Sequence, residues 1–329
     1  MTSSVRSSRL HRVARVAVAA IALGVSAMTS VATASANPAP VRSPGYHCVP
    51  YSKFPTVRPG HHARVSTSFD GFAAVFTSSL PASASTTFMP YGMALHGTLT
   101  VESGSTTWTL PRPNAVANVV INDLCLIRFD HERNPAVMIE GFTGGAHCCE
   151  EPVIYVHRSS PDGYVKVVDM TNTHFNSPVR FDINDGFVPT TLGGRVFLLT
   201  QDDHFAYTFG CYACTPMPLR LDSVSLKGLR DVTSSHPSVI AAQAAQLWKA
   251  VAPAERNGTG GPFGLLAAWT ADECVLGRGA QAWSQVLRLR SEGVLSNAKY
   301  HAATSLHGSF TAQLRSFLPK NGYCVGQLL

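Results

Sequence analysis

Hydrophobic positions between Ala63 and about Val232 fall into short runs of three to five residues, without the spacing that marks one face of a helix. β-Branched and aromatic side chains dominate these runs, and Gly, Pro, Asn and Asp fill the gaps between them. The pattern predicts β-strands joined by turns. Strands do not alternate with long helical segments, which disfavours a parallel, doubly wound sheet. The clearest runs are 72–76, 119–121, 137–139, 153–156, 164–168 and 196–199.

Near Ser235 the apolar residues begin to recur at helical spacing, for example at Ile240, Ala244 and Leu247. Ser235 is the expected N-cap, and a proline two positions later suits a first helical turn. Further helices are predicted over 263–276, 280–290 and 310–318, the last one ending before Pro319. We therefore expect a mainly β fold, built as blade-like sheets or a sandwich, with a C-terminal α-helical region.

Composition and the positions of turn-forming residues divide the chain into four predicted segments. The lead-in is rich in Pro, Gly and His and carries no periodicity, so we expect it to be extended. The segments are a signal peptide at 1–36, an extended lead-in at 37–62, a β-rich domain at 63–234 and a helical region at 235–329.

The first 36 residues have the three parts of a secretory signal. Four arginines lie before an apolar run at 16–28, and small residues end the segment at Ala36, just before Asn37. An apolar run of this length is shorter than the roughly 20 residues that span a bilayer. Cleavage between Ala36 and Asn37 is predicted, which gives a secreted, extracellular protein with no membrane insertion after signal removal. The alternative is an uncut N-terminal anchor.

The formal charge of +6 is reduced by this cleavage. The signal contains four of the 26 basic residues and none of the 20 acidic ones, so 22 basic and 20 acidic residues remain, a balance of +2. No block of Lys and Arg occurs in the remainder. Nucleic acid and anionic membrane surfaces are thus not expected as partners. The expected partner is an extracellular ligand of unknown identity.

The cysteines number eight, and an even number in an exported chain indicates disulfide bonds. Two of them, Cys274 and Cys324, lie in the predicted helical region and are expected to bond to each other. Cys211 is close enough to Cys214 to bond locally, which leaves four cysteines from the N-terminal part of the chain. The full set is Cys48, Cys125, Cys148, Cys149, Cys211, Cys214, Cys274 and Cys324, with Cys48 expected to meet Cys125.

The densest group of reactive side chains is His147-Cys148-Cys149, which follows two glycines. A direct Cys148–Cys149 bond is favoured, and bridges from this pair to Cys211 and Cys214 are the rival arrangement. The same thiols with His147 could instead bind zinc or copper(I), or a thiol could act in redox or nucleophilic chemistry. In an oxidising compartment, structural disulfides are the preferred interpretation.

The segment from Phe142 to Cys149, FTGGAHCC, resembles the GGAHCC signature of secreted bacterial proteins with FG-GAP or VCBS-like repeats, most of which are uncharacterised. The similarity covers about residues 63–325 and implies a β-rich FG-GAP/VCBS-like domain more than it implies a function. In these proteins an acidic, calcium-type loop precedes the signature, and here Asp130, Glu132 and Asn134 occupy it. Proline follows where the loop needs Gly, so a solvated turn is favoured and no cofactor is expected, with calcium as the alternative.

Catalytic motifs are absent from the sequence: neither Gly-x-Ser-x-Gly nor His-Glu-x-x-His occurs. Asp202 and His204 are expected to share one face of a strand, while Asp203 points to the other. We therefore expect a secreted, non-enzymatic binding or structural module. The alternative is an extracellular hydrolase, or a metal- or thiol-dependent enzyme, centred on His147 with Glu150 and Asp202. Convergence of these residues in one concave pocket would favour the enzyme.

Overall fold

The structure is a computed structural model, and its described part begins at Gly45. The described residues contain thirteen strands and four α-helices. The described residues are 45–50, 53, 61–79, 97–112, 120–130, 132–142, 150–169, 187–210, 215–257, 262–296 and 308–327.

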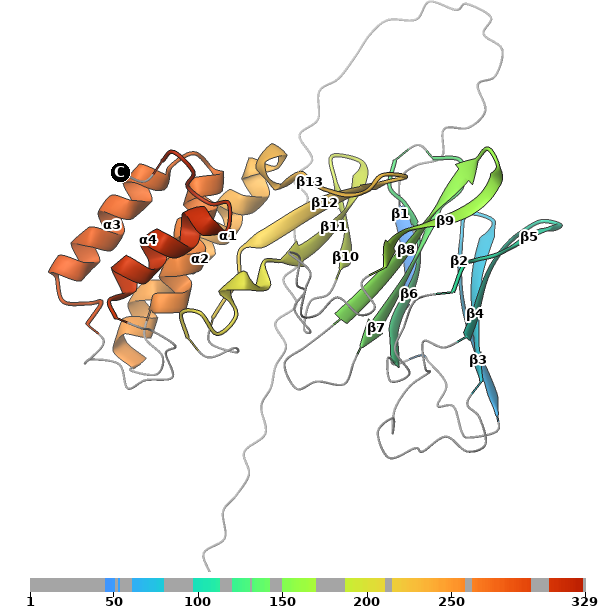
Figure 1. The fold of residues 1–329 in the computed structure, drawn as a ribbon, viewed down its shortest axis with the longest axis horizontal. Helices are drawn as coiled ribbons and strands as arrows, with labels where there is room; N and C mark the ends of the chain where they lie inside the picture. The colour runs from blue at the N-terminus through green and yellow to red at the C-terminus, as the bar shows by residue number, and fades with distance from the viewer. Residues whose placement is uncertain are drawn as a thin grey trace, which may run out of the picture. The chain divides into compact units, whose positions relative to one another are not determined.

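The strands in this part of the chain form three antiparallel sheets (Figure 1). The central sheet has the order β1-β6-β7-β8-β9, with β1 at Gly45–Pro50, β6 at Val120–Arg128, β7 at Ala136–Phe142, β8 at Glu150–Ser159 and β9 at Asp162–Asp169. The N-terminal sheet runs in sequence order through β2 (His62–Phe69), β3 (Phe72–Ser79), β4 (Gly97–Ser103) and β5 (Thr106–Thr109). The C-terminal sheet does the same through β10 (Val188–Leu192), β11 (Arg195–Gln201), β12 (Leu219–Ser225) and β13 (Gly228–Asp231).

Both faces of the central sheet are buried, and this explains the continuous apolar runs in the sequence. Successive side chains of a strand point to opposite faces. Val137 of β7 packs in one cluster with Phe76 of the N-terminal sheet. Its neighbour Met138 packs in a second cluster with Leu198 of the C-terminal sheet. A strand covered on both sides must be apolar at nearly every position, as strands in sandwiched sheets are.

Strand β1 lies inside the segment predicted to be an extended lead-in. It pairs with β6, with Cys48 directly opposite Cys125, and these two cysteines form a disulfide bond, the pairing expected from the sequence. The strand lies at the edge of the sheet and is partly exposed. An edge strand that adds to an existing sheet needs few apolar residues, so the sequence shows no alternation there.

The helical region contains α1 (Pro237–Asn257), α2 (Phe263–Val275), α3 (Gly279–Ser291) and α4 (Phe310–Lys320). The boundaries of α2 and α3 differ from the predicted ones by one residue at most, and two further differences concern the ends of α1 and α4. Ser235 belongs to a 3-10 turn, η5 (Thr233–Ser235), so His236 and not Ser235 precedes α1. Helix α4 continues through Pro319 to Lys320. Proline cannot donate the backbone hydrogen bond of a helix, and burial of Leu318 compensates for this loss in the last turn. No helix in the described residues is long and apolar enough to cross a membrane.

The chain leaving β11 packs among the helices. It forms a 3-10 turn, η3 (Asp203–Phe205), after which Phe209 follows. Phe205 and Phe209 are fully buried in the helical core, and both meet Phe317 of α4 edge to face, at ring-centroid distances of 4.9 and 5.0 Å. These aromatic contacts fix the end of β11 against the helices and so place Asp202 where the C-terminal sheet and the helical region meet.

Candidate functional site

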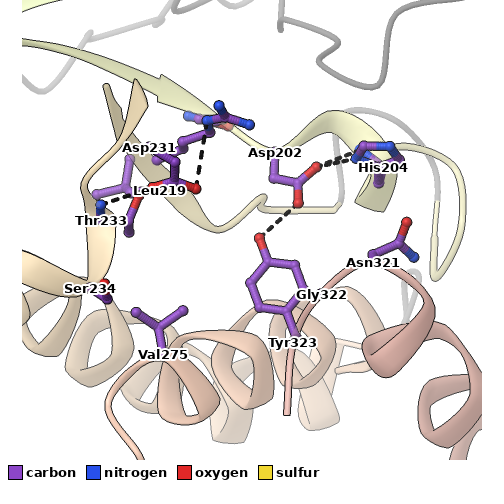
Figure 2. A pocket seen from close by; sticks show the side chains of 12 residues that line it. Asp202, His204, Leu219, Asp231, Thr233, Ser234, Val275, Asn321, Gly322 and Tyr323 are labelled. Carbon is purple, nitrogen blue, oxygen red and sulfur yellow. Dashed lines mark hydrogen bonds and ion pairs between the residues drawn. The ribbon is translucent and has the colours of Figure 1, made fainter. Parts of the chain in front are cut away.

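A polar pocket of about 430 Å³ lies at this junction (Figure 2). The end of β11, the starts of η3 and β12, the end of β13, η5, α2 and the turn after α4 all contribute to its lining. We call it the Asp202 pocket. Figure 2 shows Asp202 between His204 and Tyr323, with Asp231 and Thr233 on the other side of the opening.

The carboxylate of Asp202 joins two parts of the chain that are far apart in sequence. One oxygen accepts hydrogen bonds from the backbone N–H of His204 at 3.1 Å and pairs with the imidazole Nδ1 of the same residue at 2.6 Å. The other accepts a hydrogen bond from the hydroxyl of Tyr323 at 2.7 Å. Asp202 and His204 were expected to share one face of a strand, and this prediction is wrong because neither residue lies in a strand. Asp202 lies beyond β11 and caps η3, and this local cap brings His204 beneath it.

These contacts set the protonation of both partners. Burial would raise the pKa of Asp202, but hydrogen bonds from His204 and Tyr323, together with the imidazole charge, outweigh it and lower the pKa below its ordinary value. Burial, followed by the charge of Asp202, raises the pKa of Tyr323 well above its ordinary value. Asp202 is therefore an anion and Tyr323 a permanent donor near neutral pH.

The opposite side of the pocket holds a second group of charges. Arg220 forms two hydrogen bonds to the fully buried Asp222, at 2.9 and 3.0 Å, and lies 3.9 Å from Asp231. One oxygen of Asp231 accepts hydrogen bonds from both the backbone N–H and the hydroxyl of Thr233. Arg220 thus pairs mainly with the buried Asp222, which leaves Asp202 and Asp231 as the two carboxylates in the lining of the pocket.

The turn that carries Tyr323 is anchored to α2. Cys324 forms a disulfide bond with Cys274, the second pairing expected from the sequence. Gln327 adds two hydrogen bonds: its amide nitrogen donates to the carbonyl of Cys274 at 3.0 Å, and its amide oxygen accepts from the backbone N–H of Gly279 at 3.1 Å. The tyrosine is therefore held against Asp202 by covalent and polar contacts on its C-terminal side.

Within the described residues, one group of acidic and imidazole side chains is close enough to share an ion, namely Asp202, Asp203 and His204. Their candidate ligand atoms lie within 4.8 Å of one another. The predicted calcium loop is arranged differently. The carboxylate of Asp130 pairs with Arg195 at 3.0 Å, whereas Glu132 and Asn134 line another pocket. The residues of the predicted loop therefore lie in different surroundings: Asp130 is in an ion pair, whereas Glu132 and Asn134 line a pocket.

Several predicted site residues cannot be compared with the structure. His147 and the side chain of Glu150 lie outside the residues described, so Asp202 is the catalytic candidate that can be placed. The others outside the described residues are Ala36, Asn37, Cys148, Cys149, Cys211 and Cys214. The sequence interpretation did not include Tyr323, Arg220 or Asp231. The only sequence signal for Tyr323 was its position beside Cys324.

Comparison with known proteins gives a match to the family model described as the sll0997 C-terminal domain, over residues 240–322. The chain is also similar to a probable thylakoid lumen protein, sll0997, of Synechocystis sp. (strain ATCC 27184 / PCC 6803 / Kazusa). The two are 27% identical over 207 residues, which covers 57% of this chain and 56% of the relative. The match thus spans little more than half the length of that relative. No solved structure matches the chain.

Proposed function

We propose that the protein is an exported binding module whose Asp202 pocket takes up a small, positively charged organic ligand. The observation that carries this proposal is the ionised Asp202, held by Tyr323 and His204 at the side of a pocket that Asp231 also lines. Its volume of about 430 Å³ is within the usual range for small-molecule sites. Carboxylates gathered at a cleft concentrate cations there, and Arg220, the arginine of the lining, is already bound by Asp222.

An organic cation fits this arrangement better than a metal ion does. Both carboxylate oxygens of Asp202 already accept hydrogen bonds, one of them from Nδ1 of His204. Metal binding would cost these interactions. An ammonium or guanidinium group can instead approach Asp202 and Asp231 from the open pocket and donate additional hydrogen bonds, because each carboxylate oxygen can accept more than one.

Binding calorimetry with putrescine and agmatine tests the proposal, with succinate as a ligand of opposite charge. The variant Asp202→Asn keeps the shape of the side chain and removes its charge, and is expected to weaken amine binding about tenfold or more. Glu292→Gln is the matched control: it neutralises an exposed carboxylate just after the end of α3, outside the pocket lining, and should bind as the unchanged protein does. Preference for succinate, or equal amine binding by Asp202→Asn, would contradict the proposal.

One observation favours a second candidate function. The 2.6 Å contact between Asp202 and Nδ1 of His204 orients an imidazole in the way that carboxylates orient general bases, and Ser234 lines the same pocket. This candidate is a hydrolase centred on His204, in place of the predicted centre at His147. Hydrolysis of p-nitrophenyl acetate that is lost in His204→Ala and kept in Glu292→Gln would favour it over binding alone.

Export is supported by the signal-type sequence and by similarity to a protein named for the thylakoid lumen, a compartment that proteins reach by translocation. The disulfides Cys48–Cys125 and Cys274–Cys324 suit an oxidising compartment. N-terminal sequencing of protein recovered from the culture medium should begin at Asn37. A full-length chain retained in the membrane fraction would contradict this. The resemblance to FG-GAP or VCBS-like proteins stays a prediction, since 143–149 lie outside the described residues.

A further inference from the structure

A second pocket, of about 740 Å³, lies where parts of all three sheets converge, and it shares no lining residue with the Asp202 pocket. We call it the Trp108 pocket. Trp108 comes from β5, His157 from β8 and Asp162 from β9. The lining also includes Leu226, from the turn between β12 and β13, and residues 132–134, between β6 and β7.

The indole of Trp108 is held in one orientation. Its Nε1–H donates to one oxygen of Asp162 at 2.9 Å, and the other oxygen of Asp162 pairs with Nε2 of His157, also at 2.9 Å. His157 and Tyr164 meet the indole edge to face, at ring-centroid distances of 5.6 and 5.8 Å. The ring is only partly buried. A fixed, partly exposed aromatic ring at a pocket wall is a flat apolar surface that a ligand can meet without ordering the side chain.

Glu132 supplies a polar group that lacks a partner. Its Oε2 atom is buried but forms no hydrogen bond to any residue that the structure describes. Burial raises the pKa of this carboxyl, the charge of Asp130 adds to the effect, and Arg128 opposes it. A buried polar atom without a hydrogen bond is unfavourable, so a rotation of the Glu132 side chain that turns this oxygen toward a ligand hydroxyl would be stabilising.

The arginine of this pocket, Arg133, is exposed, whereas Arg220 of the Asp202 pocket is held by the buried Asp222. Arg133 thus offsets one of the two acidic side chains, Glu132 and Asp162, and Asn134 adds a neutral amide. A near balance of charge favours neither an anion nor an organic cation. The remaining recognition elements are one apolar aromatic surface beside several hydrogen-bonding groups.

We propose that the Trp108 pocket binds a neutral pyranose unit of an extracellular oligosaccharide or polysaccharide. A pyranose ring presents an apolar face of C–H groups, which suits the indole, and hydroxyl groups around its edge. Those hydroxyls donate to Glu132 and accept from the amide of Asn134 and the guanidinium of Arg133. Asp162 acts as a positioning residue, since its two oxygens hold Trp108 and His157.

Calorimetry with four neutral tetrasaccharides, of glucose, N-acetylglucosamine, mannose and galactose, tests this proposal. At least one should bind the unchanged protein and quench its tryptophan fluorescence. Trp108→Ala is expected to weaken that binding about tenfold or more, and Glu132→Gln severalfold, whereas Trp108→Phe should retain part of it because a flat ring remains.

Two controls separate this site from other effects. Trp248→Phe alters a tryptophan of the helical region, and Asp202→Asn alters the first pocket; both should leave saccharide binding unchanged. Melting temperatures close to that of the unchanged protein will show that Trp108→Phe and Glu132→Gln are folded. If none of the four saccharides binds, or if binding is equally strong in Trp108→Ala and Glu132→Gln, the proposal is wrong. Failure of amine binding at Asp202 has no bearing on this result.

Discussion

Replacing both Cys274 and Cys324 by serine is expected to lower the free energy of unfolding by about 4 kcal/mol. The bond closes a loop with a sequence separation of 50 residues, and the loop-entropy account of disulfides gives about this value for such a loop. Chemical denaturation of the oxidised protein and the variant, with midpoints and slopes compared, measures the difference. The loss should be accompanied by weaker amine binding, because Cys324 anchors the adjacent Tyr323 against Asp202.

The second disulfide provides the matched control. Replacing Cys48 and Cys125 by serine removes a bond with a sequence separation of 77 residues and should cost about the same stability, roughly 4 kcal/mol. That bond joins β1 to β6 and lies outside the Asp202 pocket, so amine binding by the folded control should be preserved. Equal loss of binding in both double variants, or an unchanged free energy of unfolding, would contradict the anchoring role of Cys274–Cys324.

Asp272→Asn is expected to stabilise the protein at alkaline pH. Asp272 lies in α2 and is 1% exposed, and neither of its carboxyl oxygens has a hydrogen-bond partner among the residues described. Burial, with a smaller effect of the Glu273 charge, raises its pKa from 3.8 to about 8. The carboxyl is thus protonated in the folded protein at pH values where the unfolded chain has already released the proton.

The sign of the pH dependence follows from this difference. A carboxyl whose pKa is raised by folding costs nothing below its unfolded pKa of 3.8, and stability is then lost as the pH rises towards about 8. Asparagine has the shape of the neutral acid and does not titrate, so the gain should be near zero at about pH 4 and on the order of 3–5 kcal/mol at about pH 8. Urea denaturation at both pH values measures it.

Glu292→Gln again serves as the control, because Glu292 is exposed at the C-terminal end of α3 and its removal should change stability little at either pH. An equal gain for Asp272→Asn at both pH values would show that the effect does not come from titration of Asp272. A loss of stability at alkaline pH would show that the carboxylate has a favourable role that its surroundings do not reveal.

The fold could be predicted from the sequence where burial is complete. Runs such as 153–156 and 196–199 are apolar because their strands are covered, so the sequence records them clearly. Strands β1 and β5 are largely exposed, and their composition carries little signal. They form because neighbouring strands offer unpaired backbone groups, a condition that depends on the sheet and not on the strand itself.

The Asp202 pocket shows the corresponding limit for function. The proximity of Asp202 and His204 is local, a turn formed by adjacent residues, and could be anticipated. The contact between Asp202 and Tyr323 crosses 121 positions of the chain and depends on how α2, α4 and η3 pack. Arg220 and Asp231 face the pocket because β12 and β13 pair, and neither residue has a distinctive sequence context.

The central claim is that the Asp202 pocket is the binding site for an organic cation, and NMR titration of isotope-labelled protein with putrescine tests it most directly. Backbone amide shifts should saturate and should be largest around Asp202, His204, Thr233 and Gly322, with the imidazole signals of His204 moving in parallel. The same titration of Asp202→Asn should give small, non-saturating shifts. Saturating shifts confined to the Trp108 pocket or to other surfaces, or none at these four residues, would contradict the assignment.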